Sequence, residues 1–413
     1  MASPNMTLSG VSILGGFTIT LPPTVPGAPT IGTATATSAT TATVTFTAPI
    51  NNGGATITSY TATSSPGGIT GTLNQAGSGT ITVSGLSDNT SYTFTVTATN
   101  SAGTSSPSAS SNSITTPSIV PIRKAIFGYG TTTGTNALSI TNLVSDTGVV
   151  GNDVTGVGAT RYGLAAAGYG GDKAIFGYGQ GPAPTYPFYS LTNKVSNTGV
   201  VATDTTGVGT ARYNLGASGY GGDKAIFGFG QNNVGTNLSI TNLVNNTGVV
   251  ATDTAEVGTA REGVAAAIYG SSGQAIFGYG RTGVSQSITN LVSNTGVVAT
   301  DTAGVGQPRR ELGAAGYGTD KAIFGYGFFS SALSITNLVS NTGVVANDTT
   351  GVGTGRYGLA AATYSTDKAI FGYGTTGSVT AITNLVSNTG VVANDTTGVG
   401  TARFALAASS YSA

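Results

Sequence analysis

The chain has 413 residues, enough for two or three domains on a prior of roughly 100–200 residues each. Its 15 basic and 15 acidic residues cancel, and charged residues make up only 7%, which argues against nucleic acid as a partner and against a polybasic membrane site. Cys, His and Trp are absent, so disulfides, zinc-finger sites and Ser-His-Asp triads cannot form. The sequence contains no apolar run of about 18 residues, so no membrane-spanning helix is predicted.

Residues 1–23 form a strand-like and nearly uncharged N-terminal segment. It has no Lys or Arg, and Gly and Thr interrupt its apolar residues, whereas a secretory signal needs a basic start and an unbroken apolar core. We therefore expect no signal peptide. Alone, residues 1–21 have no core to join, so we expect them to anchor the chain by adding to a sheet edge of a partner protein.

Residues 24–117 alternate apolar and polar side chains with the period of a β-strand, as in Thr43-Val-Thr-Phe-Thr47. Turn signals separate about seven such runs, which predicts a β-sandwich. The stretch from Leu86 through Tyr92 to Gly103 resembles a fibronectin type III domain, in which Leu86 and Tyr92 would form the tyrosine corner of that family. Phe46 stands where the family usually has Trp. The resemblance implies a spacer or adhesion module without catalytic residues.

Residues 122–413 contain six copies of one repeat, at intervals of 47 to 51 residues. Each copy begins with Ala-Ile-Phe-Gly-(Tyr/Phe)-Gly, and the copies start at Ala125, Ala174, Ala225, Ala275, Ala322 and Ala369. Four short strands are expected per copy, exemplified by 357–363, 173–178, 239–244 and 296–300 as the first to fourth. About fifty residues and four strands per unit predict a β-propeller.

The order of an Ala-rich strand, a turn and a strand that ends in glycines resembles a kelch blade, although the later aromatic residues of that family are missing. We therefore expect an all-β chain: a fibronectin type III-like β-sandwich followed by a six-bladed kelch-like β-propeller. The first copy lacks its first strand, while residues 403–411 supply one after the last copy. The C-terminal strand is thus predicted to complete the first blade and close the ring.

Charged and amide side chains recur once per repeat. The Asp column is Asp153, Asp204, Asp253, Asp301, Asp348 and Asp395, an Arg column follows eight residues later (Arg161, Arg212, Arg261, Arg309, Arg356, Arg403), and an Asn column precedes them (Asn142, Asn193, Asn242, Asn290, Asn337, Asn384). A catalytic group is needed once or as a pair, so we interpret these columns as structural, with Asp–Arg pairs at blade junctions. No metal, cofactor or catalytic residue is predicted. Glu262 and Arg310 replace the aromatic residue that follows the repeat Arg and are expected to pair across neighbouring blades.

The loops between the second and third strands differ from copy to copy, whereas the other turns barely vary. Aromatic side chains beside prolines suit stacking on sugar rings or a protein contact. Packing of these loops on neighbouring blades is the alternative. The candidate binding residues are Tyr186, Phe188, Tyr189, Arg281, Phe328 and Phe329.

These features favour a non-enzymatic virion structural protein of a bacteriophage, such as a capsid decoration, tail or fibre component. The near-identical Gly- and Thr-rich repeats resemble those of phage surface proteins. Assembly in the host cytoplasm and exposure on the virion surface are expected. Expected partners are other virion proteins through residues 1–21 and a host-surface glycan or protein, with a homo-oligomer as a further option. The alternative is an extracellular or cell-surface adhesin or glycan-binding protein of a bacterium.

Overall fold

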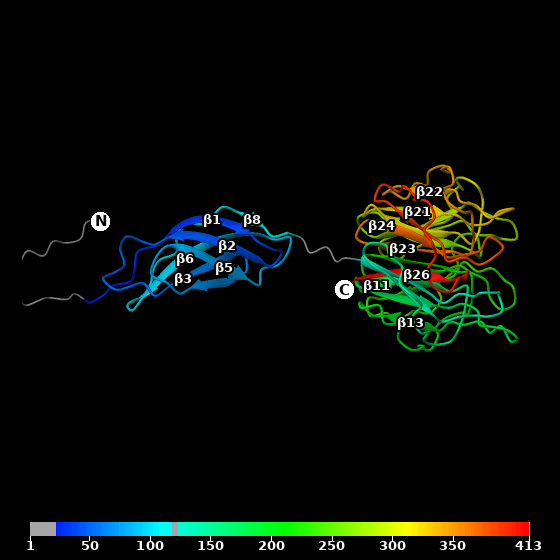
Figure 1. Cartoon of the computed structure of the whole chain (residues 1–413), viewed down its shortest axis with the longest axis horizontal. Helices are drawn as coiled ribbons and strands as arrows, with labels where there is room; N and C mark the ends of the chain where they lie inside the picture. Colours follow the sequence, from blue (N-terminus) through cyan, green and yellow to red (C-terminus); the bar gives the residue numbers. More distant parts are fainter. Residues whose placement is uncertain (1–21, 118–122, 413) are drawn as a thin grey trace, which may run out of the picture. The chain divides into compact units, whose positions relative to one another are not determined.

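The computed structural model describes residues 22–117 and 123–412, and the expected anchoring segment at residues 1–21 lies outside them. The chain divides into two compact units, Met1–Val120 and Pro121–Ala413 (Figure 1). The described residues are all-β, since none of them forms a helix.

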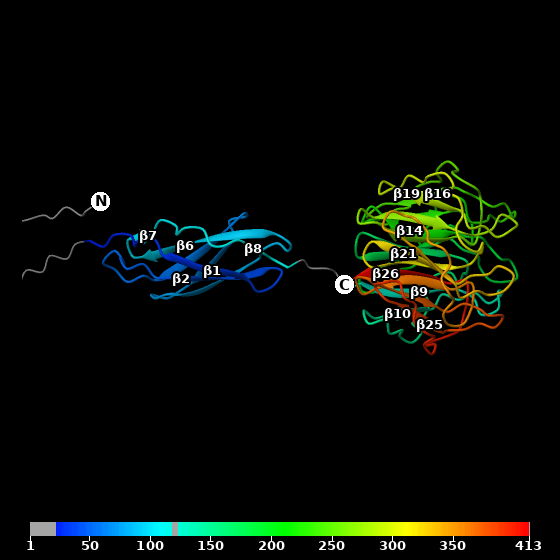
Figure 2. The ribbon, with the colours of Figure 1, turned by 90° about the horizontal axis from the view of Figure 1, so that it is seen from above.

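The first unit is a β-sandwich of two sheets (Figures 1 and 2). One sheet has the order β1-β2-β5 and the other β4-β3-β6-β7, with β8 paired to β6. The strands are β1 (Thr30–Ala36), β2 (Thr41–Thr47), β3 (Ser59–Ser65), β4 (Thr70–Leu73), β5 (Gly79–Ser84), β6 (Ser91–Asn100), β7 (Gly103–Thr104) and β8 (Ile114–Thr115).

Alternation places the apolar residues of both sheets in one core. Phe46 is buried there, with its ring centroid 4.2 Å from that of Tyr60. The predicted tyrosine corner is confirmed, because the Tyr92 hydroxyl accepts a hydrogen bond from the backbone N–H of Ser87 (3.0 Å) and Leu86 is buried beside it.

The second unit contains six three-stranded antiparallel sheets, numbered 1 to 6 in the order of their middle strands. The inner strands are β26 (Ala407–Ser412), β11 (Ala165–Tyr169), β14 (Gly216–Tyr220), β17 (Ala265–Tyr269), β20 (Gly313–Tyr317) and β23 (Ala360–Tyr364). The middle strands are β9 (Arg123–Gly128), β12 (Lys173–Gly177), β15 (Lys224–Gly228), β18 (Gln274–Gly278), β21 (Lys321–Gly325) and β24 (Lys368–Gly372). The outer strands are β10 (Thr141–Val144), β13 (Thr192–Val195), β16 (Thr241–Val244), β19 (Thr289–Val292), β22 (Thr336–Val339) and β25 (Thr383–Val386).

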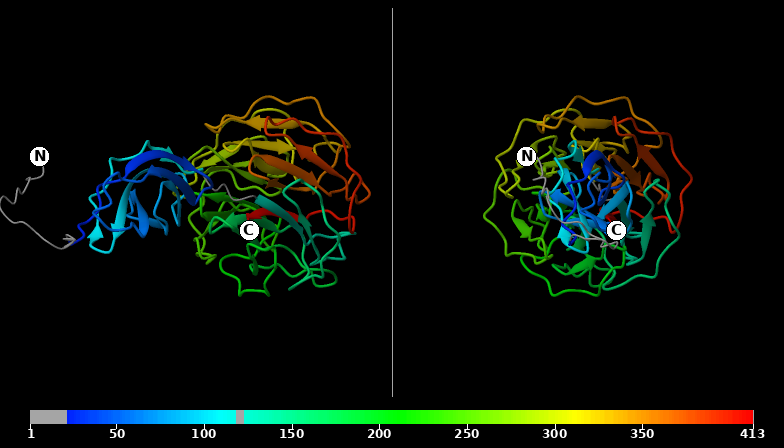
Figure 3. Two further views of the ribbon diagram at one scale, coloured as in Figure 1. Left: turned by 60° about the vertical axis from the view of Figure 1, so that its left-hand side comes forward. Right: turned by 90° about the vertical axis from the view of Figure 1, so that its left-hand side faces the viewer.

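The six inner strands contact one another in a closed cycle, and the right view of Figure 3 shows the sheets around a common axis. The predicted completion of the first sheet is confirmed: β26, from the end of the chain, pairs antiparallel with β9. A ring of six backbone hydrogen bonds of 2.7–2.9 Å also surrounds the axis. Each residue in it donates its N–H to the carbonyl of the next, in the cyclic order Gly163, Ala405, Gly358, Glu311, Gly263, Asn214 and back to Gly163.

The core of this unit lies between neighbouring sheets. Middle strands are buried on both faces, as the fully buried Ala225, Ile226 and Phe227 illustrate. The sheets approach so closely that a Cβ on Gly177 would lie 2.7 Å from Cζ of Phe227 in the next sheet. Gly at this position therefore sets the spacing between sheets.

The prediction of a fourth strand in each copy is wrong, because the corresponding segment does not form a regular strand. The segment that includes 296–300 meets the outer strand only through the single bridges Val292–Val298 and Thr289–Thr302. Between these bridges, the Ala299 carbonyl accepts from the Asn290 side chain (3.0 Å), although its N–H donates to the Leu291 carbonyl. A side-chain amide thus replaces part of the ladder that a regular strand would form.

Candidate functional site

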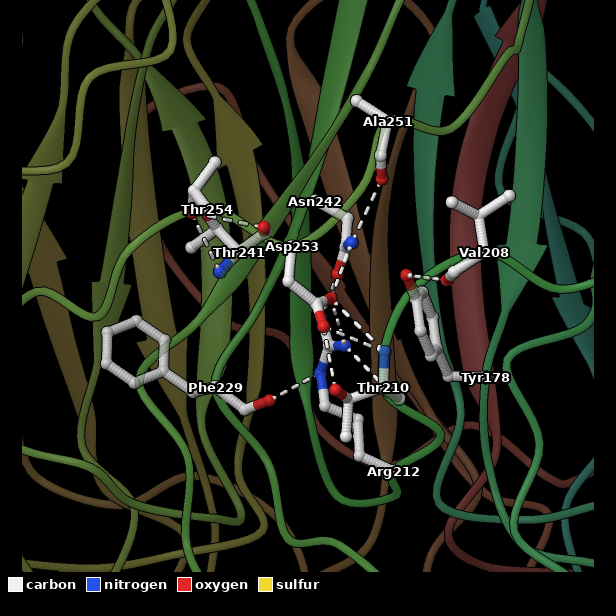
Figure 4. Close-up of polar contacts among 10 residues, drawn as sticks. All are labelled: Tyr178, Val208, Thr210, Arg212, Phe229, Thr241, Asn242, Ala251, Asp253 and Thr254. Carbon is white, nitrogen blue, oxygen red and sulfur yellow. Dashed lines mark hydrogen bonds and ion pairs between the residues drawn. The ribbon is translucent and has the colours of Figure 1, made fainter.

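A buried arginine lies at each junction between neighbouring sheets, and Figure 4 shows the junction of sheets 2 and 3. The Arg212 guanidinium lies over the Tyr178 ring, 4.2 Å from its centroid. Its Nε donates to the Phe229 carbonyl (2.8 Å), and its Nη2 donates to Oδ1 of Asn242 (2.7 Å). Burial lowers the pKa of Arg212. These acceptors compensate for the solvation that the guanidinium loses.

Asp253 holds the same junction from sheet 3. Its carboxylate accepts from Nδ2 of Asn242 (2.9 Å) and from both the N–H (3.0 Å) and the hydroxyl (2.7 Å) of Thr210, and it lies 3.9 Å from Nη1 of Arg212. Burial would raise the pKa of Asp253, but the hydrogen bonds from Thr210 and Asn242 outweigh burial and lower it. The carboxylate is therefore held in its ionised form.

The predicted structural role of the Asp and Arg columns is confirmed. Asp and Arg approach within 4.0 Å at five junctions: Arg161–Asp204, Arg212–Asp253, Arg261–Asp301, Arg309–Asp348 and Arg403–Asp153. In these five pairs the Arg meets the Asp of the following copy, so Arg403 of the last copy reaches Asp153 of the first. Two junctions depart from the pattern. Arg356 donates to the Tyr373 carbonyl and to Asn384 but forms no ion pair within 4.0 Å among the described residues, and the buried Nε of Arg161 has no hydrogen-bond partner among them.

The aromatic residue beneath each Arg has a left-handed backbone. Tyr178 has φ of 66°, a region that costs a residue with Cβ roughly 1–2 kcal/mol. Its ring packs edge-on against Phe227, with centroids 5.2 Å apart, and its hydroxyl donates to the Val208 carbonyl (3.1 Å). Burial raises its pKa to about 12. The backbone strain at Tyr178 is thus offset by the packing and the hydrogen bond of its side chain.

The two ends of the ring carry different connections between the strands. The hairpin face is the end with the turns between inner and middle strands, such as 170–172. The variable face is the opposite end, with the loops between middle and outer strands. On the variable face, a residue after the repeat Arg forms a β-bridge with the residue that opens the loop. These six rim pairs are Phe404–Thr131, Tyr162–Gln180, Tyr213–Gln231, Glu262–Arg281, Arg310–Phe328 and Tyr357–Thr375.

The predicted binding residues all lie in the variable-face loops of sheets 2, 4 and 5, but they do not form one cluster. Phe188 packs against Tyr213 of sheet 3, with ring centroids 5.2 Å apart, and Tyr189 is half-buried beside it in sequence. Phe328 packs against Tyr357 of sheet 6 at 4.9 Å. Tyr186 is 37% exposed and Phe329 is 46% exposed, which leaves these two side chains available for contact.

The expected pairing of Glu262 with Arg310 is wrong. Glu262 is buried, and its carboxylate accepts from Nε of Arg281 in its own sheet and from Nδ2 of Asn214 (2.7 Å). Arg310 instead donates to Glu311 (3.3 Å) and lies over the Phe328 ring at 4.7 Å. The rim geometry explains the difference, because each rim pair lies within one sheet.

A cavity of about 80 Å³ opens at the axis on the variable face. Its walls are the hydrogen-bonded ring of six residues and the six apolar residues that follow them, among them Leu215 and Leu312. Asn214 and Glu311 contribute its polar side chains, and burial raises the pKa of Glu311. Sequence reasoning missed both residues. Their signal is that they replace Gly in a column that is Gly in three other copies.

Comparison with known proteins places the first unit. Residues 27–114 match the family model of the Fibronectin type III domain, which confirms the predicted resemblance. Comparison with curated proteins gives no match. In the part of the chain that the structure describes, no helix could span a membrane, and no group of three or more acidic residues is placed to bind a metal ion.

Proposed function

We propose that the protein is a non-enzymatic binding protein of a bacteriophage virion, in which a six-bladed kelch-like β-propeller displays its variable face to a host-surface glycan or protein. The fibronectin type III domain would then be a spacer between the propeller and the anchored N-terminus. Six sheets around one axis, completed by a strand from the chain end, support the propeller assignment.

The contrast between the two faces is the observation that supports binding at the variable face. The repeated Asn–Asp–Arg network makes the junctions alike, so folding alone needs no difference between the loops. Yet the loop is longer in sheet 2, over 178–191, than in sheet 4, over 279–288. Variable loops on a rigid scaffold are typical of recognition surfaces.

The composition of the rim favours a glycan over a flat protein surface. Tyr162, Tyr213, Tyr357 and Phe404 lie half-buried around the axial cavity, and the exposed Tyr186 and Phe329 lie in the adjoining loops. Aromatic faces stack on sugar rings, while Asn214 and Glu311 at the cavity offer amide and carboxylate groups to hydroxyls. The virion part of the proposal rests on the sequence, namely its phage-like repeats and uncharged N-terminal segment.

Binding can be tested on an array of bacterial surface polysaccharides with the double variant Tyr186→Ser/Phe329→Ser. Both side chains are exposed, so the fold should be unchanged. The matched control is Val344→Ser, which removes a 65% exposed apolar side chain outside the variable face. We expect binding by the wild type and the control, and loss in the double variant. Equal binding by all three proteins would refute recognition at these loops.

Virion location can be tested by mass spectrometry of purified particles from cells that produce the full chain or the chain without residues 1–21. The full chain should be found in particles, and the truncated chain should be folded but absent. Absence of the full chain would refute the virion assignment, and equal incorporation of both chains would refute the anchor.

A further inference from the structure

The hairpin face has one charge that departs from the repeat. In four copies an Asp precedes the Lys that opens the middle strand, and each Lys forms an ion pair with that Asp. These pairs are Asp172–Lys173, Asp223–Lys224, Asp320–Lys321 and Asp367–Lys368, with N–O distances of 2.6 to 3.3 Å. Copy 4 has the uncharged Gly273-Gln274, whereas the first copy has Arg123-Lys124. The first copy thus replaces an anion by a cation.

Arg123 lines a cavity of about 100 Å³ at the axis. Inner-strand residues of four neighbouring sheets form its walls: Ser410, Gly168, Gly219 and Ile268. Two glycines in this row leave the space that side chains would fill. Lys173 and Lys224 also line the cavity, and no Asp or Glu is among the described residues that line it.

The three cations are not equivalent. Lys173 and Lys224 are each neutralised by the preceding Asp, yet each ammonium keeps further N–H donors. Arg123 forms no ion pair with a carboxylate of the described residues. Burial lowers the pKa of Arg123. No carboxylate of the described residues compensates for the solvation that its guanidinium loses.

We propose that this cavity binds a small tetrahedral oxyanion, phosphate or sulfate, between Arg123 and the ammonium groups of Lys173 and Lys224. A guanidinium donates two parallel hydrogen bonds to such an ion, and the three cations that line the cavity come from three different sheets. The hydroxyls of Ser410 and Ser412 line the same cavity. The volume suits one such ion, because sites for drug-sized molecules span roughly 300–1,000 Å³.

The bound ion would also tie the ring at its closure. Arg123 and Ser412 belong to sheet 1, which the two ends of this unit build together, and Lys173 and Lys224 belong to sheets 2 and 3. An ion that contacts all three cations therefore links the completed sheet to its neighbours. This role is independent of recognition at the variable face.

Isothermal titration of the full chain with inorganic phosphate, in phosphate-free buffer, tests the proposal. The variants are Arg123→Gln and Lys173→Gln, and the matched control is Lys321→Gln. Lys321 forms the same Asp pair and is equally exposed (44% against 42% for Lys173), but it does not line the cavity. Sulfate and acetate titrations distinguish a tetrahedral oxyanion from any carboxylate.

We expect saturable one-to-one binding of phosphate and sulfate by the wild type and Lys321→Gln. Binding by Arg123→Gln should be weaker by roughly tenfold or more, the effect of one lost charge-assisted hydrogen bond. Lys173→Gln should also weaken binding, and it keeps the proposal testable if Arg123→Gln does not fold. No saturable binding by the wild type, stronger binding of acetate, or equal loss in Lys321→Gln would overturn the proposal.

Discussion

Truncation of a junction arginine should destabilise the ring by an amount that depends on its hydrogen bonds. Arg212→Ala leaves the Phe229 carbonyl and Oδ1 of Asn242 without their buried donor, and it removes the contact with the Tyr178 ring. An unsatisfied buried polar group costs roughly 1–3 kcal/mol, and breaking a buried charged pair costs roughly 3–5 kcal/mol. We therefore expect a loss of about 3–5 kcal/mol, or a decrease in Tm of roughly 6–20 °C.

Arg161 provides an internal comparison, because it lies at the equivalent junction without the Nε hydrogen bond. Both substitutions delete the same fully buried side chain, so the cavity contributions nearly cancel. Arg161→Ala should be less destabilising than Arg212→Ala by about 1 kcal/mol, the net value of one hydrogen bond. Differential scanning calorimetry of the full chain measures both changes. A loss in Arg212→Ala that is no larger than in Arg161→Ala would refute the reasoning.

Three further predictions concern the ring. Deletion of residues 403–413 removes β26 and the Arg403 bonds to Tyr129 (2.7 Å) and Asn142 (2.7 Å), so the thermal transition of this unit should be lost, and an unchanged transition would contradict the closure. Hydrogen bonds from Thr and Asn lower the pKa of Asp253, so its stabilising effect should be complete above its unfolded pKa of about 4 and lost as pH falls through its lower folded pKa. Calorimetry over this range should show a steep decrease in Tm that is shallower in Asp253→Asn, and identical slopes would contradict this. Gly228→Ala places a Cβ 2.8 Å from Cζ of Phe277 and should cost roughly 1–3 kcal/mol in urea unfolding, whereas Gly77→Ala, with no atom within 4 Å, should be nearly neutral.

Local pattern was sufficient to predict most of the strands. Period-2 alternation and turn residues locate the sandwich strands, and the recurring Ala-Ile-Phe-Gly locates the middle strands of the ring. The point at which the repeat begins and ends was equally informative. The first copy lacks its inner strand, and an additional strand follows the last copy. Both facts are explained if that strand, β26, pairs with β9. The fourth strand could not be judged this way, because the competing donor is the side-chain amide of an Asn in the neighbouring outer strand, as Asn290 illustrates.

Partners across space were harder to predict than roles. The sequence places Arg161 eight residues after Asp153, yet Arg161 meets Asp204 of the next copy. The order of the strands and the direction of the segment that joins two sheets determine which Asp an Arg meets. Spacing along the sequence predicts neither of them. Glu262 likewise meets Arg281, because the bridge at the rim lies within one sheet.

Some positions of the repeat carry the same residue in every copy, and others carry a residue found in one copy only. This difference explains how one repeat can supply both a scaffold and a binding surface. An Arg that spans two sheets fixes their spacing six times over, so no single loop is needed to hold the ring. Sheet 2 illustrates this freedom. It has the longest loop between a middle and an outer strand, and it lies beside the junction at which the Nε of Arg161 has no partner among the described residues. An unpaired buried donor costs roughly 1–3 kcal/mol, which the hydrogen bonds of the other junctions can offset. Binding should therefore be sought first at positions that depart from the repeat. These are the positions where the departure costs stability, and those where a charged or aromatic residue lies at either end of the axis.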